Sequence, residues 1–276
     1  MKWSFARWSA LIISLFLVCL MLVPAAGSSE DWASLSKQMR DKCANFNQEV
    51  KDLTMIMEMM NKSSEGTITT QSTLYEKGEK FRAEMTMQMP PGSDMPKEMA
   101  GMKTIVISDG TTIWLVSPMG KTQIPASEGG RYRGQWQCGD YIPTKAEIIG
   151  SETVSGHDCW ILAAKDEKAD FAKLWVDKKS SQLMKIESKP EKEETEVVLF
   201  SDFRKVTGDW ELPYKTEVYS GKELATTIVM KSAEVNKGLA DDLFNADKVQ
   251  GGAKPSMMDL MKQKMQEQMK KKGGAE

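Results

Sequence analysis

The stretch from Gly78 to Pro118 limits the possible folds most strongly, because it reads as three β-strands in succession. Polar residues separate apolar ones at every second position of its first segment, where the apolar set is Phe81, Ala83, Met85, Met87 and Met89. Successive side chains of a strand point to opposite faces, so this alternation predicts one apolar and one polar face.

The second half of this stretch predicts a β-hairpin, because Asp109-Gly110 separates two β-branched segments, 103–108 and 111–116. We expect Asp109 and Gly110 to be its two loop residues. One face would then carry Ile105, Ile107, Trp114 and Val116, and the other Val106, Ile113 and Leu115. A sheet that is apolar on both faces needs a cover or a ligand on each.

A helix is predicted from Ser28 to about Asn47, with Ser28 or Ser29 as its N-cap. Its apolar residues recur at spacings of three and four and form one stripe: Trp32, Leu35, Met39, Cys43, Phe46 and Val50. We expect this stripe to lie on an apolar face of the sheet.

Short β-patterned segments with turn signals between them fill most of the remaining chain. This spacing predicts an antiparallel sheet, sandwich or barrel. A helical turn is expected at 241–247, and 120–141 is weakly patterned. The predicted strands are 53–59, 66–76, 146–149, 159–162, 171–176, 183–188, 196–206, 212–219 and 225–235.

The first 27 residues have the features of a secretory signal peptide cleaved near Gly27. A basic start with Lys2 and Arg7 precedes an apolar run from Leu11 to Val23, and small residues follow it. We therefore predict an exported protein with one domain at 28–250. The mature chain would carry a net charge of about −4, which argues against nucleic-acid binding.

Two further segments have open interpretations. The loop from Pro90 to Gly101 is rich in methionine, so it is either a lid over the sheet or a solvated excursion. In the tail, 251–276, methionines recur every four residues among lysines. This tail is either an amphipathic helix that contacts a membrane surface or partner, or a frayed helical or disordered terminus.

Three cysteines remain after the predicted cleavage, and a disulfide is plausible in an exported chain. We expect Cys138 and Cys159 to pair, because both lie in the same later block. Cys43, on the helical stripe, is expected to be a buried small hydrophobe.

No enzyme, cofactor or zinc motif occurs in the sequence. The single histidine, His157, lies in a turn, and neither a nucleophile elbow, a Cys-x-x-Cys pair nor a phosphate-binding glycine loop is present. We therefore predict a non-enzymatic protein without a cofactor or a metal site of this kind.

Methionine is abundant, with 21 residues, and the strand methionines alternate. Because methionine is flexible and polarisable, such faces suit ligands of variable shape such as acyl chains. Two alternatives remain: a plain core that uses methionine, and a thioether site for Cu(I). The residues concerned are Met55, Met57 and Met59 in one strand and Met85, Met87 and Met89 in another.

From about Trp32 to Phe244 the chain resembles the LolA-like superfamily of periplasmic lipoprotein carriers, in its outer-membrane lipoprotein-sorting branch. The resemblance rests on several short motifs in order: Lys80-Phe81-Arg82, Ile107-Ser108-Asp109-Gly110 with Trp114 and Ser117-Pro118, Gly156 with Cys159-Trp160, Leu174-Trp175-Val176-Asp177 with Lys185-Ile186-Glu187, Phe200-Ser201-Asp202-Phe203-Arg204, Leu212-Pro213, and Asn236-x-Gly238-Leu239 ending at Leu243-Phe244.

The resemblance implies a mainly β fold with α-helix: a strongly curved antiparallel sheet, an open half-barrel, with helices covering its concave face. It also implies a hydrophobic cavity for acyl chains in transit toward the outer membrane. The predicted cavity residues are Leu53, Met55, Met57, Met59, Phe81, Met85, Met87, Met89, Ile105, Ile107, Trp114 and Val116, and the predicted helix cover is Trp32, Leu35, Met39 and Phe46.

The resemblance is incomplete at one position. The best-known carriers have an arginine latch in an Arg-Pro-x-x-Phe motif, where this chain has Lys77-Gly78-x-x-Phe81. Lysine lacks the planar fork of arginine, so Lys77 is a candidate latch of different geometry. The sequence thus predicts a periplasmic carrier of lipids or lipoprotein acyl chains. The alternatives are an envelope sensor on the same fold and a Met-based Cu(I) protein.

Overall fold

The structure, a computed structural model, describes residues 31–64, 66–90, 92, 101–125, 141–166, 171–188 and 195–249. The predicted signal peptide, most of the loop after Pro90, Cys138 and the tail at 251–276 lie outside these residues. None of the described helices is both long enough and apolar enough to cross a lipid bilayer.

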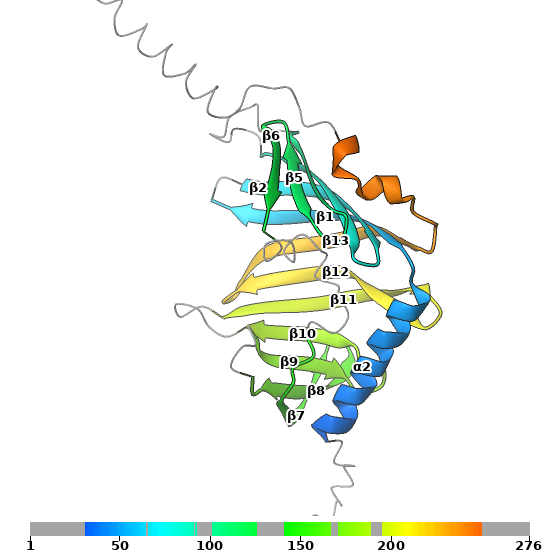
Figure 1. The fold of residues 1–276 in the computed structure, drawn as a ribbon. Coiled ribbons are helices and arrows are strands. Elements are labelled where there is room, and N and C mark those ends of the chain that lie inside the picture. Colours follow the sequence, from blue (N-terminus) through cyan, green and yellow to red (C-terminus); the bar gives the residue numbers. More distant parts are fainter. Residues whose placement is uncertain are drawn as a thin grey trace, which may run out of the picture.

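Thirteen strands of the described chain form one antiparallel sheet in the order β6-β5-β4-β3-β2-β1-β13-β12-β11-β10-β9-β8-β7 (Figure 1). Their bounds are β1 Leu53–Ser63, β2 Gly66–Lys77, β3 Lys80–Gln88, β4 Lys103–Ser108, β5 Ile113–Ser117, β6 Gly120–Ile124, β7 Ala146–Val154, β8 His157–Ala164, β9 Phe171–Asp177, β10 Leu183–Ser188, β11 Glu196–Thr207, β12 Trp210–Ser220 and β13 Glu223–Val235.

The topology is a meander with one long-range pairing. Almost every strand pairs with its neighbours in sequence, and β1 additionally pairs with β13. The consecutive strands β6 and β7 lie at opposite edges, so the sheet is not closed. Figure 1 shows β5 and β6 standing steeply against β1 and β13, as expected for a sheet that bends along its length.

The sequence located twelve of these strands, but it missed β6 and misjudged one turn. Ile107 pairs with Trp114, so the β4–β5 loop contains four residues, Asp109–Thr112, in place of two. The carboxylate of Asp109 accepts hydrogen bonds from the backbone of Thr111 and Thr112, both at 2.8 Å. This side-chain capping stabilises the longer loop.

Helix α2, Trp32–Glu49, lies along β8–β10 in Figure 1. Asp31, and not Ser28 or Ser29, is its N-cap, because the Asp31 carboxylate accepts the backbone N–H of Ser34 at 2.8 Å. Leu35 and Met39 are buried in a cluster with residues of the sheet: Leu162, Phe171, Leu174, Val176, Ile186 and Phe200. We call the side of the sheet that carries this cluster the helix face.

The C-terminal end of α2 is anchored separately. The ring of Phe46 lies 4.4 Å from that of Trp210, at the tip of the β11–β12 hairpin. The amide of Asn236 donates to the carbonyl of Glu49 at 2.9 Å, and its oxygen accepts from the backbone of Lys51 at 2.7 Å. Leu35, Met39 and Phe46 of the predicted apolar stripe are thus buried, and their role as the cover of a ligand site stays a prediction.

The other side of the sheet, which we call the opposite face, is covered at β3–β6 by residues 236–249, the C-terminal strap. This strap contains two short 3-10 helices, η2 Asp241–Phe244 and η3 Ala246–Lys248, where the sequence predicted a helical turn. Strand side chains hold its backbone carbonyls: Lys77 bonds Leu239 at 2.7 Å, Arg82 bonds Leu243 at 3.2 Å and Lys121 bonds Ala246 at 2.9 Å.

The predicted Cys138–Cys159 disulfide is wrong. Cys159 is a free thiol on β8, fully buried among Val154, Trp175 and Met184. Burial raises the pKa of this thiol to about 11, so it is protonated and unreactive. Cys43, expected to be a plain hydrophobe, is instead disulfide-bonded, and its partner lies outside the described residues.

We expect the Cys43 disulfide to stabilise the fold. Cys43→Ser removes a covalent link on α2, and the free energy of unfolding should fall by about 2 kcal/mol. Urea denaturation with and without dithiothreitol measures this loss. The reductant should shift the midpoint of the wild type and of Cys159→Ala, but not that of Cys43→Ser. An equal shift in all three would contradict the assignment.

Candidate functional site

Seven of the predicted cavity residues share the helix face. Met57 pairs directly with Met230 and with Ser72, and Ser72 pairs with Met85, so these side chains form one row across four strands. The next row toward one end runs through Met59 and Met87. The predicted cavity residues that lie on this face are Leu53, Met55, Met57, Met59, Phe81, Met85 and Met87.

Burial falls along β1 and β3 from one end of the helix face to the other. Met55 is fully buried and Phe81 is nearly so, whereas Met57, Met59 and Met85 are half-buried and Met87 is 37% exposed. Met89 follows the end of β3 and is half-buried. The methionine-rich end is therefore the accessible part of this face.

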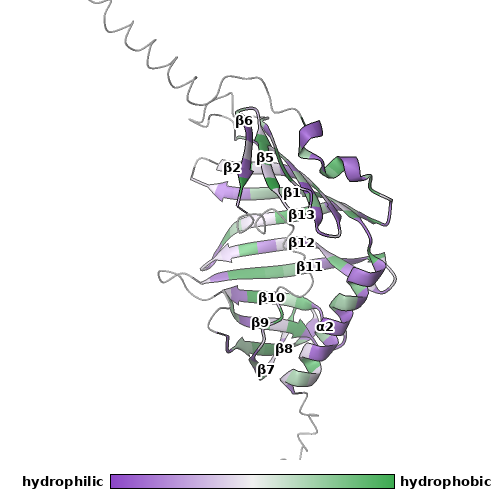
Figure 2. Ribbon diagram, viewed as in Figure 1, coloured by the Kyte–Doolittle hydropathy of each residue, from purple (hydrophilic) through white to green (hydrophobic). Residues whose placement is uncertain are grey.

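The helix face is apolar across most of the sheet, as strand register shows. Paired residues on neighbouring strands share a face. One such row runs from β7 to β2, and Figure 2 shows hydrophobic residues along β8, β10 and β11. The row is Ile148, Leu162, Leu174, Ile186, Val198, Val218, Thr226, Asn61 and Ile68.

Part of this face is buried beneath α2 and part is not. Leu162, Leu174 and Ile186 are buried in the cluster that contains Leu35 and Met39. Beyond them, on β11–β13 and β1–β3, several apolar side chains are half-buried and one, Met87, is exposed. We call this accessible set the open strip: Val198, Val218, Ile228, Met57, Met59, Met85 and Met87. An apolar surface partly open to solvent and continuous with a core suits an apolar ligand.

Four of the remaining five predicted cavity residues lie on the opposite face, and the fifth is Met89. Ile105 pairs with Glu84, and Ile107 pairs with Arg82, so they lie opposite to Ala83 and Met85. Together with Trp114 and Val116 they pack against Ala246 and Val249 of the C-terminal strap. The alternation within 103–116 was correct, but its phase relative to β3 was not, because the loop between the two strands hides their register.

Lys77 holds the C-terminal strap. Besides bonding the carbonyl of Leu239, its ammonium lies 3.1 Å from the carboxylate of Asp241, which also pairs with Lys80 at 3.2 Å. These contacts place the Lys77 ammonium at the strap on the opposite face. Its role as a latch for a ligand site stays a prediction.

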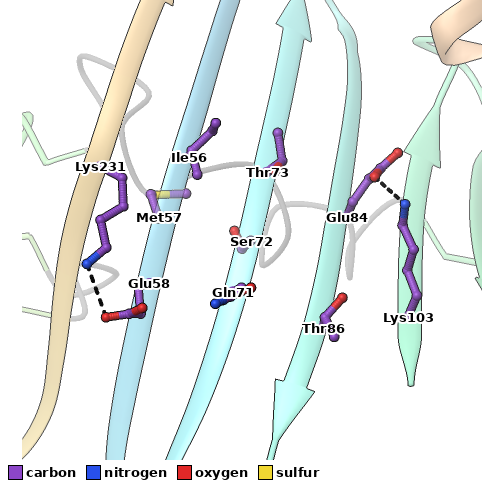
Figure 3. A pocket seen from close by; sticks show the side chains of 10 residues that line it. All are labelled: Ile56, Met57, Glu58, Gln71, Ser72, Thr73, Glu84, Thr86, Lys103 and Lys231. Atoms are coloured by element: carbon purple, nitrogen blue, oxygen red, sulfur yellow. Dashed lines mark hydrogen bonds and ion pairs between the residues drawn. The ribbon is translucent and has the colours of Figure 1, made fainter. Parts of the chain in front are cut away.

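A polar pocket of about 350 Å³ lies mainly on the opposite face (Figure 3). Lys231 pairs with Glu58 at 3.2 Å, and Glu84 lies 2.5 Å from Lys103 and 2.6 Å from Arg82. Burial opposes ionisation of Glu84, but its bonds to Lys103 and Arg82 outweigh burial and lower its pKa. The lining residues are Ile56, Met57, Glu58, Gln71, Ser72, Thr73, Glu84, Thr86, Lys103 and Lys231.

This pocket does not suit an acyl chain, because ion pairs and hydroxyls dominate its lining. Of the predicted cavity residues only Met57 borders it. The open strip, on the other side of the sheet, is therefore the stronger candidate for binding a lipid.

The described residues contain no group of three His, Cys, Asp or Glu side chains that could hold a metal ion. His157 bonds the buried carboxylate of Asp177 at 3.1 Å. That carboxylate also accepts the backbone N–H of Ser180 at 2.6 Å and of Lys179 at 3.0 Å. The Asp177 carboxylate therefore stabilises the β9–β10 turn, and its bond to His157 links this turn to β8.

Sequence reasoning missed the contribution of β11–β13 to the open strip. Ile228 and Met230 alternate in the same way as the methionines of β1, and Val218 and Val198 continue the row. The alternation in 225–235 was visible in the sequence. What was lacking was the pairing of β13 with β1, which joins segments about 170 residues apart.

No curated protein matches this chain. A family model described only as an uncharacterized protein matches residues 139–250. Among solved structures, a domain from Vibrio parahaemolyticus assigned to outer membrane lipoprotein sorting superposes with a TM-score of 0.53 at 16% identity, covering 76% of this chain and 96% of that one.

Two further structures give the same result. A DUF1329 family protein from Desulfovibrio piger superposes with a TM-score of 0.55 at 18% identity, covering 78% of this chain and 99% of that one. A LolA superfamily protein from Nitrosomonas europaea gives 0.51 at 14% identity, with coverages of 78% and 99%. At this identity the similarity establishes the architecture alone: the chain has a LolA-like fold.

Proposed function

We propose that this protein is a non-enzymatic extracytoplasmic carrier that binds acyl chains on the helix face of its sheet. The observation that carries the proposal is the open strip, an accessible, methionine-rich surface continuous with the core beneath α2. The similarity in fold to a lipoprotein-sorting domain and to a LolA superfamily protein supports it. In this proposal the helix face is the concave face and α2 covers one end of the site.

The chemistry of the strip fits this cargo. Each methylene group moved from water onto an apolar surface contributes about 0.8 kcal/mol, so an acyl chain can bind tightly without specific polar contacts. Methionine side chains adapt to chains of different length and branching. The predicted leader directs the protein to the periplasm, where the cargo would be a lipid or a lipoprotein bound for the outer membrane.

A charge on the strip tests the proposal. Met59→Lys places an ammonium among the strip residues, and we expect its affinity for a fluorescent fatty acid to fall at least tenfold, because burying that charge is costly. Ile56→Lys is the matched control: Ile56 lies on the same strand, is 44% exposed and belongs to the opposite face. Fluorescence titration measures both affinities.

The control should bind like the wild type. Equal affinities of the wild type and both variants for the fatty acid would show that it does not bind on the open strip. Absence of any fatty-acid binding by the wild type, together with no lipid in extracts of protein purified from its own envelope, would refute the carrier function itself.

A further inference from the structure

One polar pair interrupts the otherwise apolar row across the helix face. From Ile148 on β7 to Ile68 on β2 the row contains only aliphatic residues, except for Thr226 and Asn61. These two residues pair with each other across β13 and β1. Both are half-buried and lie beside Met59 and Ile228 of the open strip.

The pair holds the Asn61 side chain in a defined orientation. The hydroxyl of Thr226 donates to the Asn61 carbonyl oxygen at 2.7 Å. An asparagine side chain has one acceptor oxygen and one amide nitrogen with two N–H donors. Because the oxygen is engaged by Thr226, the nitrogen is directed away from it, and no described residue accepts from this nitrogen.

An amide with two unused donors on an apolar surface is costly to cover with hydrocarbon alone. A ligand that lies on the strip must therefore either avoid Asn61 or offer it an acceptor. The one acceptor common to acyl chains is the carbonyl oxygen of the ester or amide that joins the chain to its head group. Resting on the proposed carrier function, we propose that Asn61 binds this acyl carbonyl oxygen and thereby sets the position of the chain.

The geometry of the row agrees with that position. Four inter-strand steps of about 4.8 Å separate Asn61 from Ile186, where the cover by α2 begins, which gives a path of about 19 Å. Thr226, Val218 and Val198 lie along it. A long acyl chain with its carbonyl at Asn61 can extend along this path to the edge of α2, while the head group remains at the β1–β2 side.

Matched lipids with and without the carbonyl test the inference. We expect the wild type to bind a diester phosphatidylcholine about fivefold more tightly than the diether analogue of equal chain length, because the ether lipid leaves the Asn61 amide unpaired. A palmitoylated peptide and its N-hexadecyl counterpart, which lacks the carbonyl, give the same comparison for an amide. A preference seen only with the phospholipids indicates a phospholipid as the source of the carbonyl, and one seen only with the peptides indicates a lipoprotein.

Asn61→Leu should bind the ester and ether lipids equally, with the ether affinity unchanged or improved. Asn61→Asp keeps the shape of the side chain but lacks its N–H donors, so it should also lose the preference for the ester lipid. This variant replaces Asn61→Leu in the test if the leucine variant does not fold. Gln71→Leu, an amide-to-aliphatic change on the opposite face, should keep the preference.

The outcomes separate this inference from the carrier proposal. Equal binding of ester and ether lipids by the wild type, or a preference that survives in Asn61→Leu, overturns the role of Asn61 and leaves the carrier function standing. Failure of the wild type to bind either lipid overturns the carrier function itself.

Discussion

Asp52→Ala should lower the free energy of unfolding by about 3 kcal/mol, because one buried carboxylate organises the start of the C-terminal strap. Asp52 is only 4% exposed. Its two oxygens accept three consecutive backbone N–H groups, those of Lys237 at 2.7 Å, Gly238 at 2.8 Å and Leu239 at 3.3 Å. Hydrogen bonds to a charged acceptor are stronger than neutral ones, and the alanine variant loses all three.

The backbone at this corner explains why the effect is large. Asn236 and Gly238 adopt left-handed conformations, with φ of 57° and 76°, so that the chain turns its amides toward one point. The strap that follows covers Ile105, Ile107 and Val116. Without the carboxylate this turn has no anion to stabilise it, and the cover over those residues loosens.

Urea denaturation followed by tryptophan fluorescence measures the loss. Asp52→Asn keeps one acceptor oxygen without the charge, so its free energy of unfolding should fall by about half as much as that of Asp52→Ala. Lys237→Ala removes an exposed side chain at the same turn and should change stability by less than about 0.5 kcal/mol. An alanine variant as stable as Lys237→Ala would show that the three hydrogen bonds contribute little.

The same corner illustrates what the sequence alone could predict. The Asn236-x-Gly238-Leu239 motif was recognised as part of a resemblance, and its glycine indicates a turn. Its partner Asp52 lies about 185 residues earlier, just before β1, and nothing in the local pattern links the two. Alternation specified which residues share a face within a strand, but long-range pairing decides which strands share a site.

The candidate site was predictable to the same extent. Met55, Met57 and Met59 were assigned to one face from their spacing alone, and the structure places them with Met85 and Met87. The four residues around the β4–β5 hairpin were assigned to the wrong face of the sheet, because the register of β4 against β3 cannot be read across the long loop between them. Asn61 and Thr226 were not predicted as site residues, because only the pairing of β13 with β1 brings the two side chains together.

Cysteine pairing failed for a related reason. Proximity along the chain suggested Cys138 and Cys159, but Cys159 lies inside an apolar cluster with Trp175 and Met184. Disulfide geometry requires the two Cβ atoms to approach within about 4.5 Å, a condition that sequence separation does not determine. The helix that carries Cys43 is the element that the disulfide secures.

Leu35→Ala should destabilise the protein by about 3 kcal/mol and loosen α2 from the sheet. Leu35 is 1% exposed and packs with Met39, Leu162 and Leu174, so the substitution leaves a cavity between the helix and β8–β9. Lys37→Ala is the matched control on the same helix. Its ion pair with Asp41, at 2.6 Å, lies in solvent, and such pairs contribute at most about 1 kcal/mol.

The two variants distinguish a packed cover from a loosely attached helix. If α2 is part of the cooperative core, hydrogen exchange of its amides in Leu35→Ala should accelerate together with the fall in global stability, whereas Lys37→Ala should leave both near the wild-type values. A Leu35→Ala variant that loses less than about 1 kcal/mol would mean that α2 adds little to the core. The helix face would then be accessible as far as Leu162 and Leu174, which would lengthen the surface available to an acyl chain by about two strands.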